Sequence, residues 1–276
     1  MKKIQFLTLF IVAILFSSCN DTVVIENNSN NNNNEEPISG QFKKRVLIED
    51  YTGTWCGNCT RVAYAIEQVK EETDNVVSVA IHNGNDPYHF EGIDPLKNLI
   101  SPNNALALPV SRLNRVVVWT FPETSNIQQA VDLTGKNTGL GLAMNSSLVD
   151  DVVNLDVNVK FAQDYSDLKL VVYLLEDGLV YEQTNYTIYY DGEDHIADFV
   201  HNHVLRVSMT DILGENITDA TTLGSTFTKS FSIPVPSNIE NASNISFVAF
   251  VVGSDNKTIN SRASHINETQ EFEQNP

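Results

Sequence analysis

The sequence is poor in cysteine and in basic residues. Its 276 residues include only 3 cysteines, and 17 lysines and arginines stand against 35 aspartates and glutamates, which gives a formal net charge of -18. Phosphate backbones and anionic lipid surfaces repel so acidic a chain, so we expect no nucleic acid partner. Three cysteines allow one intrachain pair and leave one thiol over.

Long apolar runs are also scarce, and the longest is N-terminal. Lys2 and Lys3 precede a largely apolar run from Ile4 to Phe16, which is typical of a secretory signal. The run is too short to span a bilayer comfortably, and no other segment approaches the length of a transmembrane helix. We therefore expect residues 1–18 to be a signal peptide and the protein to be exported.

A cysteine follows this apolar run. Phe16-Ser17-Ser18-Cys19 resembles the lipobox of bacterial lipoproteins, although Phe16 stands where leucine is usual. In a lipobox the cysteine is acylated, so Cys19 is the predicted lipidation site and the lipid anchor is the only expected membrane contact. The alternative is an ordinary signal peptide cut nearby, which leaves Cys19 as a spare thiol.

Composition divides the rest of the chain into three segments. Residues 19–40 are rich in asparagine and too polar to bury a core, which predicts a disordered tether. Residues 41–138 contain a short apolar run from Val46 to Tyr51, helical spacing from Cys59 to Thr73 and a β-branched run from Val76 to Ile81. That order predicts a parallel strand, helix, strand unit.

Other elements follow in the same segment and beyond it. Pro109 precedes a hairpin expected to turn near Asn114, and Ser125 to Leu133 is expected to form a closing helix. In residues 139–276 apolar and polar residues alternate, which predicts an all-β domain with the sandwich spacing of strands. The expected strands are Val153–Phe161, Leu168–Leu175, Phe199–Met209, Phe227–Val235 and Ile245–Val252.

Cys56 and Cys59 are separated by two residues and have three possible uses. Structural zinc is disfavoured, because it needs about four ligands and only one cysteine pair is present. A purely structural disulfide closing so small a loop stabilises little. A redox pair fits better, because a thiolate at the start of the predicted helix is stabilised by unpaired backbone N–H groups and the helix dipole.

The segment IEDYTGTWCGNC, from Ile48 to Cys59, resembles the thioredoxin active site. The resemblance implies Cys56 as nucleophile, Cys59 as resolving thiol, Trp55 as flanking aromatic, Asp50 as buried proton acceptor for Cys59 and Pro109 as a cis-proline facing the cysteines. The alternatives are that Asp50 is a polar strand end, that Trp55 only packs and that Pro109 is an ordinary trans proline. Asn58 replaces the proline or histidine that is usual between the cysteines, so the direction of electron flow stays open, and Leu108 is bulkier than the residue that usually precedes the cis-proline, where the substrate backbone binds.

Histidines offer weaker candidates for a metal site. His82 follows the second predicted strand and is placed near Cys56, where it either tunes the thiolate, helps to bind a soft metal or bonds to Asn83 or Asp86 in a turn. His201 and His203 alternate on a predicted strand with His195 nearby, and we expect packing or a domain contact rather than metal binding.

Longer motifs make the chain similar to a family of exported bacterial lipoproteins named after a 28-kDa outer membrane protein. The motifs are EDYTGTWCGNCTR from Glu49, VAIHNGNDP from Val79, LPVSRLNR from Leu108, VVYLLEDGLVYEQ from Val171 and HNHVLRVSMTDILGE from His201. Thr60 departs from the proline that often follows the second cysteine. The family implies an α+β fold of two domains, a thioredoxin-like α/β domain at 41–138 and an immunoglobulin-like sandwich at 139–276, and an outer membrane location.

Two functions follow, with a narrower third. The first is thiol-disulfide exchange with client proteins and an unidentified redox partner, without a dissociable cofactor and on a lipoprotein that faces the periplasm or the cell surface. The second is a surface-displayed binding or scaffold lipoprotein whose disulfide never turns over. The third is handling of a soft ion such as Cu(I) by Cys56, Cys59 and His82.

Overall fold

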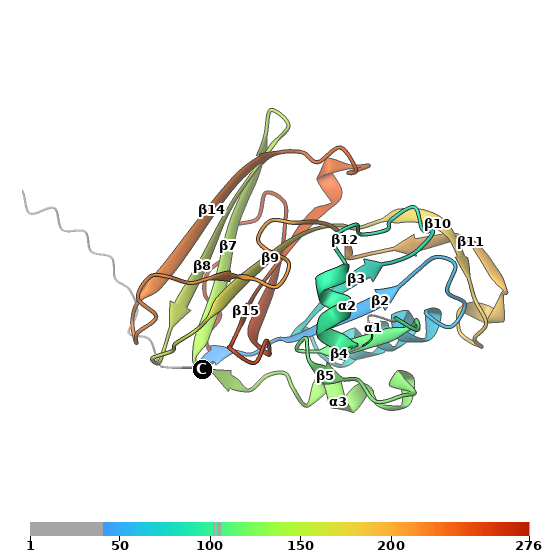
Figure 1. The fold of residues 1–276 in the computed structure, drawn as a ribbon, viewed down its shortest axis with the longest axis horizontal. Helices are drawn as coiled ribbons and strands as arrows, with labels where there is room; N and C mark the ends of the chain where they lie inside the picture. Colours follow the sequence, from blue (N-terminus) through green and yellow to red (C-terminus); the bar gives the residue numbers. More distant parts are fainter. Residues whose placement is uncertain (1–40, 102, 104–105, 276) are drawn as a thin grey trace, which may run out of the picture. The chain divides into compact units, whose positions relative to one another are not determined.

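The structure is a computed structural model that describes residues 41–101, 103 and 106–275. The expected signal peptide, Cys19 and the expected tether lie outside the described residues. The α-helices are α1 (Thr60–Glu72), α2 (Asp94–Ile100) and α3 (Ile127–Val131), and the 3-10 helices are η1 (Glu123–Ser125), η2 (Tyr190–Gly192) and η3 (Ala242–Asn244). Figure 1 shows how the three α-helices lie around the sheets.

Strands make up most of the described chain. In the N-terminal half they are β1 (Phe42–Lys43), β2 (Val46–Thr52), β3 (Val76–His82), β4 (Val110–Leu113), β5 (Val117–Val118) and β6 (Asn137–Thr138). In the C-terminal half they are β7 (Leu140–Val149), β8 (Val152–Phe161), β9 (Lys169–Glu176), β10 (Leu179–Thr184), β11 (His195–His201), β12 (Val204–Ser208), β13 (Glu215–Asn216), β14 (Thr226–Pro234), β15 (Ile245–Val252) and β16 (Thr258–His265).

One mixed sheet runs through both halves in the order β16-β15-β9-β12-β3-β2-β4-β5, with β13 paired to β9. β2 and β3 are parallel and joined by α1, as predicted, while β2 and β4 are antiparallel. β12 links the halves, because it pairs antiparallel with β9 and parallel with β3. The fold is therefore mixed α/β, and the two segments expected from the sequence share a sheet.

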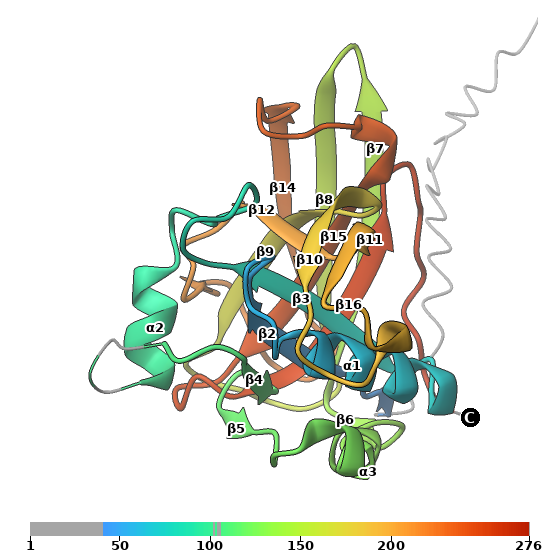
Figure 2. The same cartoon turned by 90° about the vertical axis from the view of Figure 1, so that its right-hand side faces the viewer.

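Two cores cover opposite faces of β9 and β15. On one face, Leu170, Leu174 and Phe247 pack against the separate sheet β14-β8-β7. On the other face, Tyr173 and Phe250 pack with the residues of β2, β3 and α2 that face them. Burial on both faces explains why these strands are uninterrupted apolar runs. A third core joins α1 and α3 to the face of β2 opposite α2 (Figure 2).

Two expected elements differ from the structure. The helix expected at Ser125–Leu133 is shortened to α3, because Asn126 has a non-helical backbone and its carbonyl accepts a hydrogen bond from Trp119 Nε1 at 2.9 Å. The strand expected at Phe199–Met209 is broken between β11 and β12, where His203 has φ 58°. Asp177 Oδ1 accepts from His203 N at 2.7 Å and holds this break.

Because the cores share strands, a destabilising substitution in the sandwich should also destabilise the core around α1. We expect Leu155→Ala, at a fully buried site of β8, to lower the free energy of unfolding by about 2–5 kcal/mol. Urea unfolding followed by Trp119 fluorescence in a Trp55→Phe background checks it, because Trp119 lies in the α1 core. Val149→Ala, on an exposed site, is the control, and an unchanged Trp119 transition would contradict the shared sheet.

Candidate functional site

Cys56 and Cys59 form a disulfide between the end of β2 and the start of α1, with 5.4 Å between their Cα atoms. Cys59 caps the helix, because its carbonyl accepts from Val62 N and Ala63 N. Cys56 lies in the preceding turn, where its carbonyl accepts from Cys59 N at 3.0 Å. The sequence predicts Cys56 at the start of the helix, but α1 begins only at Thr60, so Cys56 precedes it. Both cysteines still lie at the N-terminal end of the helix.

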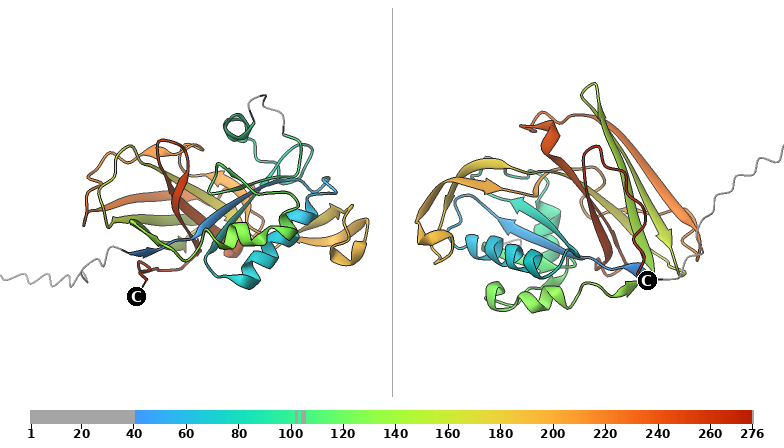
Figure 3. Two further views of the ribbon diagram at one scale, coloured as in Figure 1. Left: turned by 90° about the horizontal axis from the view of Figure 1, so that it is seen from below. Right: turned by 180° about the vertical axis from the view of Figure 1, so that it is seen from behind.

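The disulfide is covered by a hairpin that we call the arm, residues 179–201, made of β10, β11 and their connecting loop. Cys56 is 5% and Cys59 1% exposed. Thr184 N donates to the carbonyl oxygen of Thr54 at 2.9 Å, and Tyr186 N donates to that of Gly57 at 2.8 Å. The arm therefore adds backbone hydrogen bonds to the cysteine loop itself, at the edge of the fold where it projects beside α1 (Figure 3).

Side chains fix the arm in the same place. Gln183 Nε2 donates to the Cys56 carbonyl oxygen at 3.2 Å, and Thr60 Oγ1 donates to Asn185 Oδ1 at 2.8 Å. The ring of Tyr186 lies so close to Gly57 that a Cβ there would come within 2.4 Å of it. A larger residue at position 57 would therefore push the Tyr186 ring away from the cysteine loop. No local pattern predicts contact between the cysteine loop and a segment so far along the chain.

Trp55 stands beside the disulfide and is 48% exposed. Its Nε1 donates to the Asn83 carbonyl oxygen at 2.8 Å, and a Cβ on Gly53 would come within 2.8 Å of Nε1. The indole is therefore held against two loops while one side remains open to solvent. This arrangement provides an apolar surface next to Cys56.

Asp50 lies on the face of β2 that is turned toward α1 and lines the same cavity as Cys59. Its side chain is buried, and its Oδ1 makes no hydrogen bond among the described residues. Burial raises the pKa of Asp50 well above its ordinary value, Glu123 raises it further and Arg61 opposes the shift. The raised pKa makes Asp50 a better proton acceptor than an exposed aspartate, and the residue lines the cavity that Cys59 also lines.

Glu123 was not singled out from the sequence. It is 4% exposed and accepts from Arg61 Nε at 2.7 Å and from Ser111 Oγ at 3.3 Å. Arg61 also stacks over Phe121, which is 69% exposed. Glu123 and Asp50 lie 73 positions apart in the sequence (123 minus 50), so only the folded chain shows that these two buried acids are close together.

Pro109 directly precedes β4, and the Leu108–Pro109 peptide is cis, as predicted. Val110 pairs with Tyr51 near the end of β2, so Pro109 comes at the end of β4 that lies toward the cysteine loop. The Phe121–Pro122 peptide is also cis, which the sequence did not suggest.

His82 is buried at the end of β3 and bonds to Asp86, the turn arrangement considered from the sequence. Its Nδ1 lies 3.0 Å from Asp86 Oδ2, and the same oxygen accepts from Thr54 N at 2.6 Å. Asp86 thereby joins His82 to the cysteine loop. Within the described ranges, no group of three or more His, Cys, Asp or Glu side chains is placed to hold a metal ion.

A family model described as outer membrane protein Omp28 matches residues 97–270, well over half of the chain. The chain belongs to the Omp28 family. The matched segment includes the arm and Pro109 and begins after the two cysteines. The family name agrees with the outer membrane location expected from the sequence, and in the described part of the chain no helix is long and apolar enough to cross a bilayer.

Among solved structures, this Omp28 family member is similar to HBP35 of Porphyromonas gingivalis. The TM-score is 0.62 at 17% sequence identity, covering 86% of this chain and 81% of that one. The likeness shows a shared fold. β-Glucosidase 3B of Thermotoga neapolitana, in complex with glucose, matches at a TM-score of only 0.23 and 12% identity, over 56% of this chain and 23% of that one. No curated protein matches.

In this Omp28 family protein the histidines at the end of the arm do not share a strand, contrary to expectation. His201 ends β11 and packs its ring against His82 at 5.3 Å and Tyr88 at 5.5 Å between centroids. His203 lies beyond the strand break and bonds to Asp177. His195 is exposed at the start of β11. His201 therefore packs, as the sequence interpretation favoured.

Burial, and then the neighbouring His82, lower the pKa of His201 from 6.5 to about 4. The unfolded chain therefore binds a proton at His201 that the folded protein does not, and this contribution weakens folding as the pH falls from 6.5 to about 4. We expect His201→Phe to lose less stability than the wild type across that window. Denaturant titrations at several pH values check it, and an NMR titration showing His201 with a pKa near 6.5 would contradict it.

Proposed function

We propose that the protein is an exported, lipid-anchored thiol-disulfide oxidoreductase of the outer membrane, with Cys19 as the lipidated residue. The observation that carries the proposal is the Cys56–Cys59 disulfide at the N-terminal end of α1, with the buried carboxyl of Asp50 lining the cavity behind Cys59. We also propose that β2, α1 and β3 form a thioredoxin-like unit and that the chain beyond residue 139 forms an immunoglobulin-like sandwich.

The exchange proceeds through a mixed disulfide. In the reduced protein the Cys56 thiolate attacks one sulfur of a client disulfide, and the other client sulfur leaves as a thiolate. Cys59 then loses its proton to Asp50 and attacks Cys56 Sγ, which releases the client as a dithiol and reforms the Cys56–Cys59 bond. The reverse sequence oxidises a client dithiol, and a separate redox partner restores the starting state. No dissociable cofactor takes part.

Removing the resolving sulfur should trap the first intermediate. Cys59→Ser is expected to accumulate client proteins joined to Cys56 through a bond that dithiothreitol cleaves, whereas Cys56→Ser accumulates none. Non-reducing electrophoresis of the affinity-purified variants, followed by mass spectrometry, identifies the adducts. If Cys59→Ser carries no adduct while a thioredoxin variant expressed alongside it does, exchange with clients is ruled out.

The arm limits access to Cys56, so a client sulfur reaches it when the tip of the arm moves. We expect Tyr186→Ala to raise the rate at which dithiothreitol reduces the disulfide about fivefold, because the arm loses roughly 1 kcal/mol of contact with the cysteine loop. Ile188→Ala is the matched control, since Ile188 is 87% exposed on the same loop. Equal rates for Tyr186→Ala and the wild type would show that the arm does not limit access.

Burial of both sulfurs also supports a second function, a binding or scaffold lipoprotein with a permanently closed disulfide. The reduction potential of the pair separates the two. A value below roughly -300 mV favours the scaffold, because exported redox partners would not open such a bond, and each 30 mV corresponds to about 1.4 kcal/mol.

A further inference from the structure

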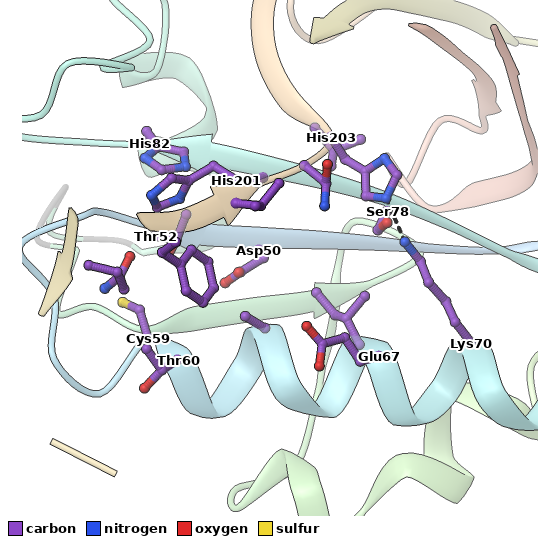
Figure 4. A pocket seen from close by; sticks show the side chains of 18 residues that line it. Asp50, Thr52, Cys59, Thr60, Glu67, Lys70, Ser78, His82, His201 and His203 are labelled. Atoms are coloured by element: carbon purple, nitrogen blue, oxygen red, sulfur yellow. Dashed lines mark hydrogen bonds between the residues drawn. The ribbon is translucent and has the colours of Figure 1, made fainter. Parts of the chain in front are cut away.

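A cavity of about 110 Å³, lined by both polar and apolar side chains, lies directly behind Cys59, between α1 and the sheet (Figure 4). Cys59, Ala63, Glu67 and Lys70 line it along one face of α1, at spacings of three and four residues. Across from them are alternate residues of β2 and β3, the last residue of β11 and the connection to β12: Asp50, Thr52, Ser78, Ala80, His82, His201 and His203. The cavity runs from the disulfide to the far end of α1.

Three residues that line this cavity each have a buried polar atom that makes no hydrogen bond within the described chain: Asp50 Oδ1, Ser78 Oγ and His201 Nε2. Their residues are only 4%, 6% and 5% exposed. Buried polar groups cost free energy when they are left without a partner, and a cavity of this size with polar side chains in its wall has room for several water molecules. We therefore expect the cavity to hold water that hydrogen-bonds with the polar side chains lining it.

At the other end of the cavity, Lys70, His203 and Asp177 form a line of hydrogen bonds toward the surface. Lys70 Nζ lies 2.5 Å from His203 Nε2, and His203 Nδ1 lies 2.9 Å from Asp177 Oδ1. Asp177 accepts the Nδ1 proton, which leaves Nε2 free to accept from Lys70. The side chains of His203 and Asp177 are 32% and 21% exposed, so the line ends in solvent.

Charged and titratable groups surround Lys70 and His203 from every packed element. On the cavity side they are Asp50, Glu67, His82 and His201, and on the opposite side Arg45, Asp177, Arg262, His265, Glu268 and Glu273. Burial lowers the pKa of Lys70, against the opposing effect of Asp177 and Glu67. Burial raises the pKa of Asp177, but hydrogen bonding to His203 outweighs this effect and lowers the pKa to about 2. Asp177 therefore stays ionised and keeps His203 in this orientation.

We propose that Lys70, His203 and the cavity water form a proton relay between solvent and Asp50, with Asp177 as the residue that positions His203. The proposal rests on the thiol-disulfide exchange proposed above. No hydrogen bond joins Asp50 to Cys59 in the described contacts, so a proton passing between them needs the water that the cavity accommodates.

The relay completes the resolving step. Cys59 gives its thiol proton through water to Asp50 and forms the bond to Cys56 Sγ, while the client sulfur leaves as a thiolate. A proton then passes from Asp50 into the cavity water. Lys70 donates a proton to His203 Nε2 and takes one from the water, and His203 releases one to solvent. Electrons move only between the sulfurs, and one proton leaves for each Cys59 thiol consumed.

The resolving step can be timed in the mature chain carrying Cys19→Ser, reduced and mixed with 5,5′-dithiobis(2-nitrobenzoate). Cys56 releases one thionitrobenzoate as it attacks the reagent, and Cys59 releases a second from the mixed disulfide in a step independent of reagent concentration. We expect Lys70→Met and His203→Asn each to slow the second phase about tenfold, with the first phase unchanged. Asparagine accepts the left-handed backbone of position 203 and so should preserve the fold.

Lys70→Arg separates a relay from a structural contact. Arginine keeps the positive charge and a donor toward His203 but does not release its proton in proteins, so the second phase should stay slow. Lys97→Met, which removes a surface lysine paired with Asp94, should leave both phases unchanged. A solvent deuterium isotope effect on the second phase should grow in Lys70→Met and His203→Asn relative to the wild type.

Two outcomes would overturn the relay: second-phase rates in Lys70→Met and His203→Asn equal to the wild type, or full restoration of the rate by Lys70→Arg. The reagent reacts with the thiol pair whether or not the protein has clients. Absence of trapped clients in Cys59→Ser therefore rejects the proposed function but not the relay. The rate of the second phase tests the relay separately.

Discussion

The structure depends on two strands, β9 and β15, that are buried on both faces. One face of each closes the sandwich with β7, β8 and β14, and the other belongs to the core shared with β2, β3 and α2. Both cores need these strands, because β9 and β15 form one side of each core. This constraint also fixes the cysteine loop, because β2 and α1, which carry it, are packed on a sheet whose other end lies inside the sandwich.

The same constraint explains how the arm reaches the disulfide. β9 ends at Glu176, and the next strand to join the main sheet is β12, which inserts between β9 and β3. The chain between them leaves the sheet as β10 and returns as β11, on the side where β3 ends at His82. Because β2 ends in register with β3, at the pair Thr52 and His82, the arm emerges beside the cysteine loop. A segment of the C-terminal half thereby becomes part of the site.

Local patterns were enough to predict the elements that carry the cysteines, but the surroundings of the cysteines depend on contacts between distant segments. The strand, helix, strand order and the hairpin near Asn114 follow from periods and turn residues within short windows, and the cis peptide before Pro109 is what the thioredoxin resemblance implies. The cover over Cys56, the nearness of Glu123 to Asp50 and the break at His203 do not, because each needs a partner more than twenty positions away. The apolar run of β9 predicted a strand and gave no sign that two cores would share it.

The residue after the second cysteine shows how the arm and the site depend on one another. Thr60 is the first residue of α1, a position where proline is well tolerated because its missing N–H is not needed there. Proline at this position would nevertheless remove the hydroxyl that donates to Asn185 Oδ1. Asn185 is buried, and its amide nitrogen donates to the carbonyl oxygens of Tyr189 and Glu193, which shape the loop of the arm. Threonine at position 60 is therefore explained by what covers the helix start, since the helix alone would accept either residue.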